Sequence, residues 1–322
     1  MTIKTLHLEN VIKNHTQDMT NKVVAITGTT SGTGFVCARE TAKLGGTVLL
    51  LNRASQRSES SLQKLKEQVP NGIFDPITCD LQDFESVRKA ISEISSKYDA
   101  IDVLCNNAGV MALKDQATRD GYDIQMQTNC ISHFLLTKDL FPLLKKVRDA
   151  RVVNHSSMAR LGVPLDMKYF GKNNVTLGGD GNEEENSSFS GPRWQRYHQT
   201  KLANCAFTYG LKQKLEQNNI TNVKSLLAHP GLALTNLRFT TAETGGMDAN
   251  SPIMSNAQTE EDGALGIIRA SMDKEAQSGN FYGPAQWTGY PDLLTPEEIL
   301  YDPQNIQINW DGCEAAVGKF VF

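Results

Sequence analysis

The sequence has few cysteines, and their spacing excludes several kinds of site. Its six cysteines are scattered over 322 residues, and no two are close enough for a CxxC metal or redox motif. Most lie within apolar runs, which is typical of reduced core residues and not of a disulfide framework. We therefore expect no metal site and no redox-active cysteine pair.

The chain also lacks a strong charge of one sign, a basic block, an apolar N-terminal run and an internal repeat. Its net charge is −4, which gives no electrostatic support for a nucleic-acid or anionic-membrane partner and favours a small-molecule ligand. Residues 1–20 are polar and interrupted by charges. Neither a signal peptide nor a membrane anchor is expected there, and a cytoplasmic location is predicted.

What the chain does contain is an apolar run that leads directly into a glycine-rich turn. In KVVAITGTTSGTG, residues 23–26 are predicted to form a buried strand, and residues 35–44 an amphipathic helix that Gly45 and Gly46 end. Between a strand and a helix, glycines let the backbone approach a pyrophosphate at the helix N-terminus. The turn predicts a dinucleotide site, although glycine before a helix can also serve conformation alone.

Strand-like and helix-like segments alternate along most of the chain. The predicted strands are 47–51, 73–79, 101–105, 151–154 and 223–228, and the predicted helices include 58–69, 83–97 and 259–272. With 39% hydrophobic residues, this pattern predicts a single α/β domain with a Rossmann-like, doubly wound, mostly parallel sheet. Residues 21–294 are assigned to the domain, 1–20 to an N-terminal extension and 295–322 to a covering tail.

In a dinucleotide-binding fold, the residues that follow the second strand, here predicted at 47–51, bind the adenosine ribose and distinguish NAD from NADP. An arginine there can pair with the 2′-phosphate of NADP, so Arg53 favours NADP, and Arg57 is a second candidate contact. The alternative is a solvated Arg53, because the other reading position, Ser31, is not basic. Asp80, after the third strand, is expected at the adenine.

Several motifs occur in the order of a known family. TGTTSGTG at 27–34, CDL at 79–81, NNAG at 106–109, a serine pair at 156–157, YHQTK at 197–201 and HPG at 229–231 resemble the short-chain dehydrogenase/reductase family. The runs NNAGVM, TNCISHFLLT, RYHQTKLAN and HPGLALTNL are most similar to its retinol-dehydrogenase-like and WW-domain-oxidoreductase-like branch. The resemblance implies an NADP(H)-dependent enzyme that interconverts an alcohol and a carbonyl on a small lipophilic substrate. Family members often pair through helices, so a homo-oligomer is one expectation.

A tyrosine and a lysine carry the expected chemistry. Hydride transfer to or from a carbinol carbon requires a group that gives or takes the hydroxyl proton. Tyr197 and Lys201 lie at i and i+4 of a predicted helix and share one face, and an ammonium beside a phenol favours the phenolate. By resemblance, Lys201 also bonds the nicotinamide ribose.

Two further roles are implied by the resemblance. Ser157 is expected to hold the substrate oxygen as charge develops, while Ser156 is a capping or structural serine. Asn129 is expected to anchor a water relay to the lysine, and the alternative is a helix-interior asparagine bonded to its own backbone. His155 stands where an apolar residue is expected, and we predict that it packs and takes no part in the reaction.

The residues expected to bind the cofactor come from the loops at one edge of the predicted sheet. Among them, Thr235 matches the position that bonds the carboxamide. The full set is Gly28, Ser31, Gly32, Thr33, Gly34, Arg53, Asp80, Leu81, Asn107, Ala108, Gly109, Tyr197, Lys201, Pro230, Gly231 and Thr235.

Two segments are longer than the corresponding segments of a minimal member of the family. An insertion is expected near 166–193, as a surface excursion or as a cover over the site, and its polar, glycine-rich part at 177–192 is predicted to be mobile. A loop near 238–258 is expected to act as a lid. Four aromatic residues are candidates either to line an apolar pocket or to pack in the core: Phe281, Tyr282, Trp287 and Tyr290.

Two other functions are compatible with the same motifs. Light-dependent protochlorophyllide reductases use a similar tyrosine and lysine to reduce an activated C=C bond. Some family members serve as non-catalytic, NADP-binding regulatory modules. Because every catalytic position is filled here, the sequence favours an enzyme.

Overall fold

Apolar residues face both sides of the central strands, and this pattern builds two separate cores. In β1 (Val23–Thr27), Ala25 packs into the core on one face of the sheet, while Val24 and Ile26 pack into the core on the other. Successive side chains of a strand point to opposite faces, so a strand that is apolar at every position must be covered on both. The helices supply that cover.

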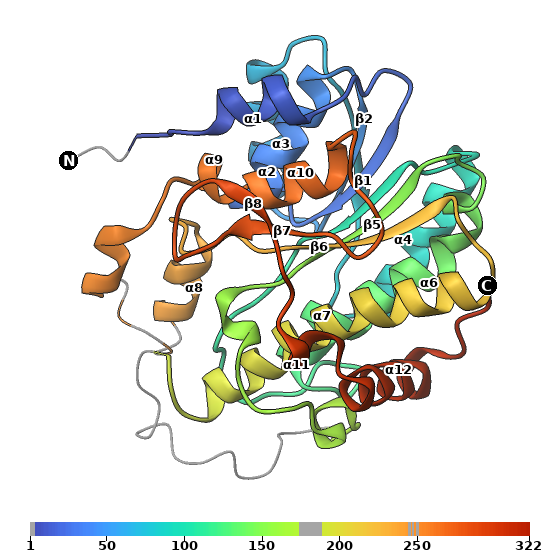
Figure 1. Cartoon of the computed structure of the whole chain (residues 1–322), viewed down its shortest axis with the longest axis vertical. Coiled ribbons are helices and arrows are strands. Elements are labelled where there is room, and N and C mark those ends of the chain that lie inside the picture. The colour runs from blue at the N-terminus through green and yellow to red at the C-terminus, as the bar shows by residue number, and fades with distance from the viewer. Residues whose placement is uncertain (1–3, 174–188, 244–245, 247, 249–250) are drawn as a thin grey trace.

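The computed structural model describes residues 4–173, 189–243, 246, 248 and 251–322. These residues form an eight-stranded sheet with the order β3-β2-β1-β4-β5-β6-β7-β8, in which only β7 and β8 pair antiparallel (Figure 1). The remaining strands are β2 (Thr47–Asn52), β3 (Ile73–Thr78), β4 (Val103–Asn106), β5 (Ala150–His155), β6 (Val223–Ala228), β7 (Phe281–Pro284) and β8 (Pro291–Leu294). The prediction of a doubly wound, mostly parallel sheet in one domain is confirmed.

Helices cover the two faces of the sheet in separate layers (Figure 1). The helices in one layer are α1 (Leu8–His15), α2 (Gly32–Lys43), α3 (Gln56–Gln68) and α10 (Leu265–Met272). Those in the other are α4 (Phe84–Lys97), α6 (Ser132–Leu144), α7 (Pro192–Gln217) and α12 (Pro303–Val317). Trp310 of α12 packs edge-on against Phe134 of α6, so the C-terminal segment closes the second core.

Short elements connect these layers. They are α5 (Ile124–Met126), the π-helix η1 (Gln127–Ile131), η2 (Met158–Arg160), η3 (Met167–Phe170), α8 (Leu237–Glu243), η5 (Pro252–Asn256), α9 (Glu260–Gly263) and α11 (Glu298–Tyr301). The helix predicted at 259–272 is therefore two helices, α9 and α10, with a break at Ala264.

Two other elements differ from the sequence prediction. Helix α2 begins at Gly32, three residues before the predicted start, because glycines add no apolar periodicity to the pattern that defined it. Strands β7 and β8 were not predicted, since each has four residues and contains proline, which strands disfavour. Phe281 and Tyr282 are buried in β7, so they pack in the core.

The expected insertion near 166–193 is described only in part. Tyr169 and Phe170 in η3 are buried, and the Phe170 ring lies so close to Gly312 of α12 that a Cβ there would come within 2.5 Å of it. This part of the segment belongs to the core. Residues 174–188 lie outside the described residues, and so does most of the stretch predicted to be mobile.

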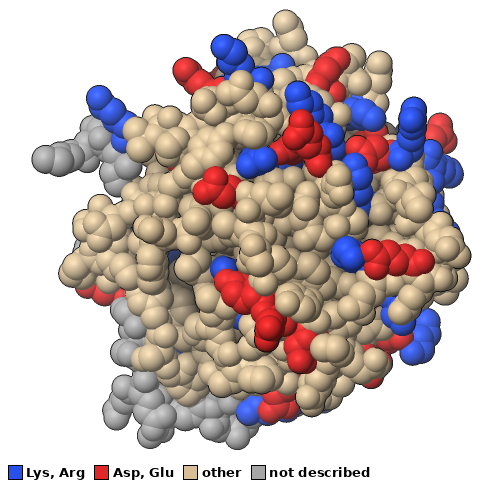
Figure 2. All heavy atoms as spheres, viewed as in Figure 1, with Lys and Arg blue, Asp and Glu red and all other residues tan. Residues whose placement is uncertain are grey.

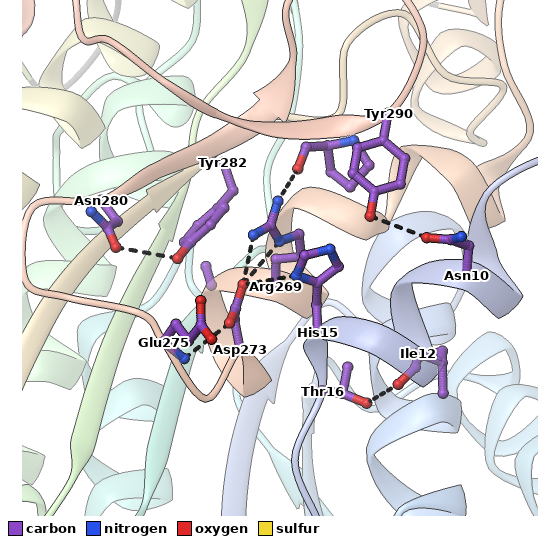
Figure 3. Close-up of polar contacts among 12 residues, drawn as sticks. Asn10, Ile12, His15, Thr16, Arg269, Asp273, Glu275, Asn280, Tyr282 and Tyr290 are labelled. Atoms are coloured by element: carbon purple, nitrogen blue, oxygen red, sulfur yellow. Dashed lines mark hydrogen bonds and ion pairs between the residues drawn. The ribbon is translucent and has the colours of Figure 1, made fainter.

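Residues 4–20 are tied to the domain by buried contacts (Figure 3). Val11 of α1 is fully buried. Beside it, Arg269 of α10 donates to Asp273 Oδ2 from Nη2 at 2.7 Å and to the Pro291 carbonyl from Nη1 at 2.7 Å. His15 Nδ1 lies 3.6 Å from the same Asp273 oxygen, so α1, α10 and β8 share one polar cluster.

The state of the cysteines and the distribution of surface charge agree with the expectations from the composition. All six cysteines are buried and free, as predicted. Acidic and basic side chains are intermixed on the face shown in Figure 2. Of the described helices, none is both long enough and apolar enough to cross a membrane.

Candidate active site

The carboxyl ends of the parallel strands meet at one edge of the sheet, and a cavity of about 290 Å³ lies there. Most of the site residues expected from the sequence line it. They are Gly28, Ser31, Gly32, Thr33, Arg53, Asp80, Leu81, Asn107, Ala108, Gly109, Ser157, Tyr197, Lys201, Pro230 and Thr235. Gly34, Asn129 and Gly231 do not line this cavity.

The glycine-rich turn forms one wall of the cavity. Gly28 and Gly32 have φ values of +73° and +62°, a left-handed conformation that glycine adopts at low cost. At Gly34 a Cβ would lie 2.3 Å from both Asn107 Nδ2 and the Gly28 carbonyl oxygen, so only glycine lets α2 pack this closely on the turn. Gly34 therefore shapes the turn from behind without facing the cavity.

Asn107 connects the glycine turn to the strands beside it. Its Nδ2 donates to the Thr27 carbonyl at 2.9 Å, and its Oδ1 accepts from Thr33 Oγ1 and from His155 Nδ1, each at 2.9 Å. Burial lowers the pKa of His155, so its ring is neutral. His155 thus has the structural role predicted for it, but as a hydrogen-bonding partner of Asn107.

Tyr197, Lys201 and Ser157 come together at the junction of α7 with the end of β5. The Ser157 hydroxyl accepts from the Ala159 amide at 3.2 Å and lies close enough to Tyr197 to lower the pKa of its phenol. Lys201 Nζ lies 5.6 Å from the centre of the Tyr197 ring and donates to the His155 carbonyl at 3.1 Å. Ser156 Oγ instead donates to the Lys201 carbonyl at 2.8 Å, so this serine holds α7 against β5.

Burial is the main influence on the pKa values of Tyr197 and Lys201. It raises the pKa of Tyr197 to about 12, with the Ser157 hydrogen bond acting in the opposite direction. It lowers the pKa of Lys201 to about 8. The sequence argument expected the neighbouring ammonium and an oxidised nicotinamide to favour the phenolate. In the chain by itself desolvation is the larger effect, because both side chains are almost completely enclosed. Burial thus reinforces the protonated phenol that the ordinary tyrosine pKa of about 10 already favours at neutral pH.

Asn129 sits in η1, where the helix widens. Its side chain does not bond its own backbone: Oδ1 accepts from the Val110 amide at 2.8 Å, and Nδ2 donates to the Val110 carbonyl at 2.8 Å and to Thr200 Oγ1 at 2.9 Å. A Cβ on Gly109 would lie 3.2 Å from Asn129 Oδ1 and 3.5 Å from Lys201 Nζ. Asn129 and Lys201 therefore flank the same glycine.

The C-terminal end of β2 and the first turn of α3 line part of the same cavity. Arg53 and Arg57 are both exposed, and Arg57 Nη2 donates to Ser31 Oγ at 2.5 Å. Asn52 was missed as a site residue. Its Oδ1 accepts from the Thr29 amide at 2.9 Å and fixes the glycine turn to β2. Its only sequence signal was its position at the end of a buried strand.

A second cavity, of about 230 Å³, adjoins the first at Ser157 and Tyr197 and is lined mainly by apolar side chains. Trp194 and Met254, which line it, were not singled out from the sequence. Met254 belongs to η5 within the expected lid, and Trp287 is the one candidate aromatic residue that reaches this cavity. Gly231 also lines it, and a Cβ there would come within 2.4 Å of the Trp287 carbonyl.

The two cavities share a small set of lining residues. They are Ser157, Tyr197, Pro230, Thr235 and Leu237. A polar chamber beside a glycine turn and an apolar chamber thus meet at the one tyrosine and serine expected to carry the chemistry.

Comparison with known proteins identifies the family. A family model described as short chain dehydrogenase matches residues 22–169. Mouse retinol dehydrogenase 14 is 31% identical over 323 residues, covering 93% of this chain and 87% of that protein. The chain belongs to the short-chain dehydrogenase/reductase family. Its resemblance to the retinol-dehydrogenase-like branch is confirmed by the same matches.

Other members of the family match over part of their length. An uncharacterised oxidoreductase of Schizosaccharomyces pombe is 33% identical, and human retinol dehydrogenase 13 is 30% identical, over 70% and 67% of this chain. The matched chain spans 64% and 60% of those two proteins, less than two thirds of either.

Solved structures of the family have the same fold. An uncharacterised protein from Mycobacterium Paratuberculosis superposes with a TM-score of 0.74 at 26% identity, with 100% of both chains covered. L-sorbose reductase from Gluconobacter frateurii, in a complex with NADPH and L-sorbose, superposes with a TM-score of 0.58 at 20% identity over 82% of this chain and 96% of that one. At that identity the second likeness speaks for the fold alone.

Proposed function

We propose that this oxidoreductase uses NADP(H) to interconvert a carbonyl and an alcohol on a lipophilic substrate, with Tyr197 as the acid and base. The observation that carries the proposal is that the polar and the apolar cavity share Ser157 and Tyr197. A reductase of this kind needs its dinucleotide and its substrate to meet at a proton donor, and a tyrosine common to both chambers satisfies that need.

The residues of the polar cavity fit a dinucleotide phosphate. Gly28 and Gly32 have positive φ values, which favour glycine, and because glycine has no side chain the wall of the turn stays open. A Cβ at Gly28 would come within 2.9 Å of Ala108. Among the described residues, the exposed Arg53 guanidinium has no ion-pair partner and suits a 2′-phosphate. When bound, the dinucleotide supplies or accepts a hydride, and the chain must supply the proton and the binding.

Each catalytic side chain then has a separate task. In the reductive direction, the Tyr197 phenol gives its proton to the substrate oxygen, for which a pKa raised to about 12 by burial keeps the proton in place beforehand. Ser157 holds the same oxygen by a hydrogen bond as negative charge develops there. Lys201 bonds the nicotinamide ribose, and Asn129 supports the water relay that returns the proton.

A panel of carbonyl compounds tests this function. We expect loss of the nicotinamide absorbance of NADPH with straight-chain aldehydes, and kcat/KM rising by up to about fourfold per methylene while the chain still enters the apolar cavity. Chromatography of the product of an enal distinguishes an allylic alcohol from a saturated aldehyde, and so separates carbonyl from C=C reduction. If neither aldehydes with NADPH nor alcohols with NADP⁺ react, the proposal is wrong and a binding module is favoured.

The cofactor assignment predicts a preference that depends on one arginine. NADPH is expected to bind more tightly than NADH, and Arg53→Ala to reduce the ratio of the two dissociation constants by about ten- to a hundredfold, since it removes a charge-assisted pair with the phosphate. Cofactor fluorescence titrations measure both constants. Arg148→Ala, an exposed arginine at the opposite edge of the sheet, is the matched control. Equal affinities of the wild type for the two cofactors would exclude the assignment.

The pKa of Lys201 predicts a pH dependence of cofactor affinity. Burial lowers that pKa to about 8, so the ammonium that bonds the ribose is present below pH 8 and is lost as the pH rises through it. NADPH affinity is expected to fall by up to about tenfold between pH 7 and pH 9. Adenosine 2′,5′-bisphosphate lacks the nicotinamide ribose and should show no such fall. A flat NADPH profile in the wild type, or the same fall in Lys201→Met, would contradict this role.

A further inference from the structure

The apolar cavity contains one permanently charged side chain among the described residues that line it, Arg238. Arg238 lies in the first turn of α8, directly after Leu237, which lines both cavities. Arg238 lines the apolar cavity only. Arg238 therefore borders the space assigned to the substrate and not the chamber assigned to the dinucleotide.

Among the described residues, no carboxylate pairs with the guanidinium of Arg238. The side chain is half-buried, and its Nε is enclosed without a hydrogen-bond partner in the described structure. The carbon of the guanidinium lies 4.4 Å from the centre of the Phe239 ring, a contact that favours a cation but leaves its N–H donors unused. A buried donor without a partner is costly, and at a residue that lines a cavity a ligand is one group that can satisfy it.

Two other arginines with little exposed surface each have a carboxylate partner. Arg160 donates from Nη2 to Glu297 at 2.5 Å, and Arg269 donates to Asp273. Each of those pairs neutralises a guanidinium that folding has removed from water. No carboxylate among the described residues does this for Arg238, so within that part of the chain its guanidinium is available to a ligand in the cavity.

We propose that Arg238 binds an oxyanion carried by the substrate away from its reacting carbon. A guanidinium presents Nε and Nη donors in a plane that matches the two oxygens of a carboxylate. The surrounding wall is apolar, with Trp194, Met254 and Trp287 among its residues. The substrate class is thus an oxo acid or hydroxy acid, in which an apolar chain joins a carbonyl or alcohol at Tyr197 to a carboxylate at Arg238.

This inference rests on the proposed function, and a paired substrate series tests it. Aldehydes that carry a terminal carboxylate, over a range of chain lengths, are compared with their methyl esters in the holoenzyme with NADPH. At the best chain length the wild type is expected to prefer the acid by about tenfold or more in kcat/KM. Arg238→Gln should abolish that preference through KM, with kcat/KM for the ester and the NADPH affinity unchanged. Arg238→Lys should retain part of the preference, since the charge stays and the planar fork is lost.

Controls separate this inference from the proposed function. Arg148→Gln removes an exposed positive charge at the other edge of the sheet and should leave the acid preference intact. Reduction of the esters without any preference for the acids, or a preference that survives in Arg238→Gln, would overturn the role of Arg238 while leaving the reductase assignment standing.

A binding measurement decides the case in which no aldehyde is reduced. Octanoate, octyl sulfate and octanamide are titrated against the tryptophan fluorescence of the full chain, because Trp194 and Trp287 line the cavity. We expect octanoate to bind at least about tenfold more tightly than octanamide in the wild type and equally in Arg238→Gln. Tighter binding of octyl sulfate than of octanoate would assign the site to a sulfate ester. Equal binding of all three by the wild type would overturn the inference.

Discussion

Tyr197→Phe is expected to lower the turnover of any carbonyl substrate by about 10²- to 10⁴-fold, which is the usual contribution of a general acid. The substitution removes one hydroxyl and keeps the ring that packs edge-on against Trp194 at a centroid distance of 5.8 Å. The fold and the dinucleotide chamber should therefore be preserved, and the NADPH dissociation constant should change by no more than about twofold. Single-turnover rates at saturating NADPH, together with a fluorescence titration, measure the two effects separately.

The same helix offers a matched control for this variant. Tyr209 is also buried in α7, but its hydroxyl has no hydrogen-bond partner in the described structure and it lines neither cavity. Tyr209→Phe deletes the same atom from the same helix and should leave turnover unchanged. Turnover of Tyr197→Phe within a few-fold of the wild type would remove Tyr197 from the chemistry.

Asp273→Ala is expected to lower the free energy of unfolding by about 3 kcal/mol, near the lower end of the cost of breaking a buried ion pair. The Asp273 and Arg269 side chains are only 3% and 11% exposed, so the variant leaves an enclosed guanidinium without its carboxylate (Figure 3). The bond from Arg269 to the Pro291 carbonyl remains and limits the loss. Urea unfolding at pH 7 gives the difference.

An exposed ion pair provides the comparison for this prediction. Glu85 and Lys89 of α4 are 61% and 75% exposed, and their contact of 2.7 Å is an i,i+4 pair. Glu85→Gln should leave the urea midpoint almost unchanged, because solvent screens such pairs. If the two variants were equally stable, the polar cluster that joins α1, α10 and β8 would have no measurable effect on the fold.

Local patterns in the sequence were enough to predict β1 to β6, most helices and which residues follow the buried strands. Runs such as 47–51 are apolar at each position, and the residues that follow them at the edge of a parallel sheet must lie close together. For this reason Arg53 and Asp80 could be assigned to one site before any contact was known, whereas Asn107 and Ser157 were selected by the resemblance to the family. Strands β7 and β8 could not be predicted in this way, because pairing at the sheet edge, and not their own composition, makes them strands.

What the sequence by itself determined is the order of strands, turns and helices and the chemical groups placed at their ends, since periodicity and glycine spacing are local properties. The tertiary structure alone decided which of those groups are enclosed and which lack a partner. The raised pKa of Tyr197, the bond between Asn107 and His155, the meeting of two cavities at Ser157 and the unpartnered Nε of Arg238 in the described structure all arise in this way. Each depends on desolvation and on contacts between residues far apart in the chain, for which a linear sequence carries no local signal.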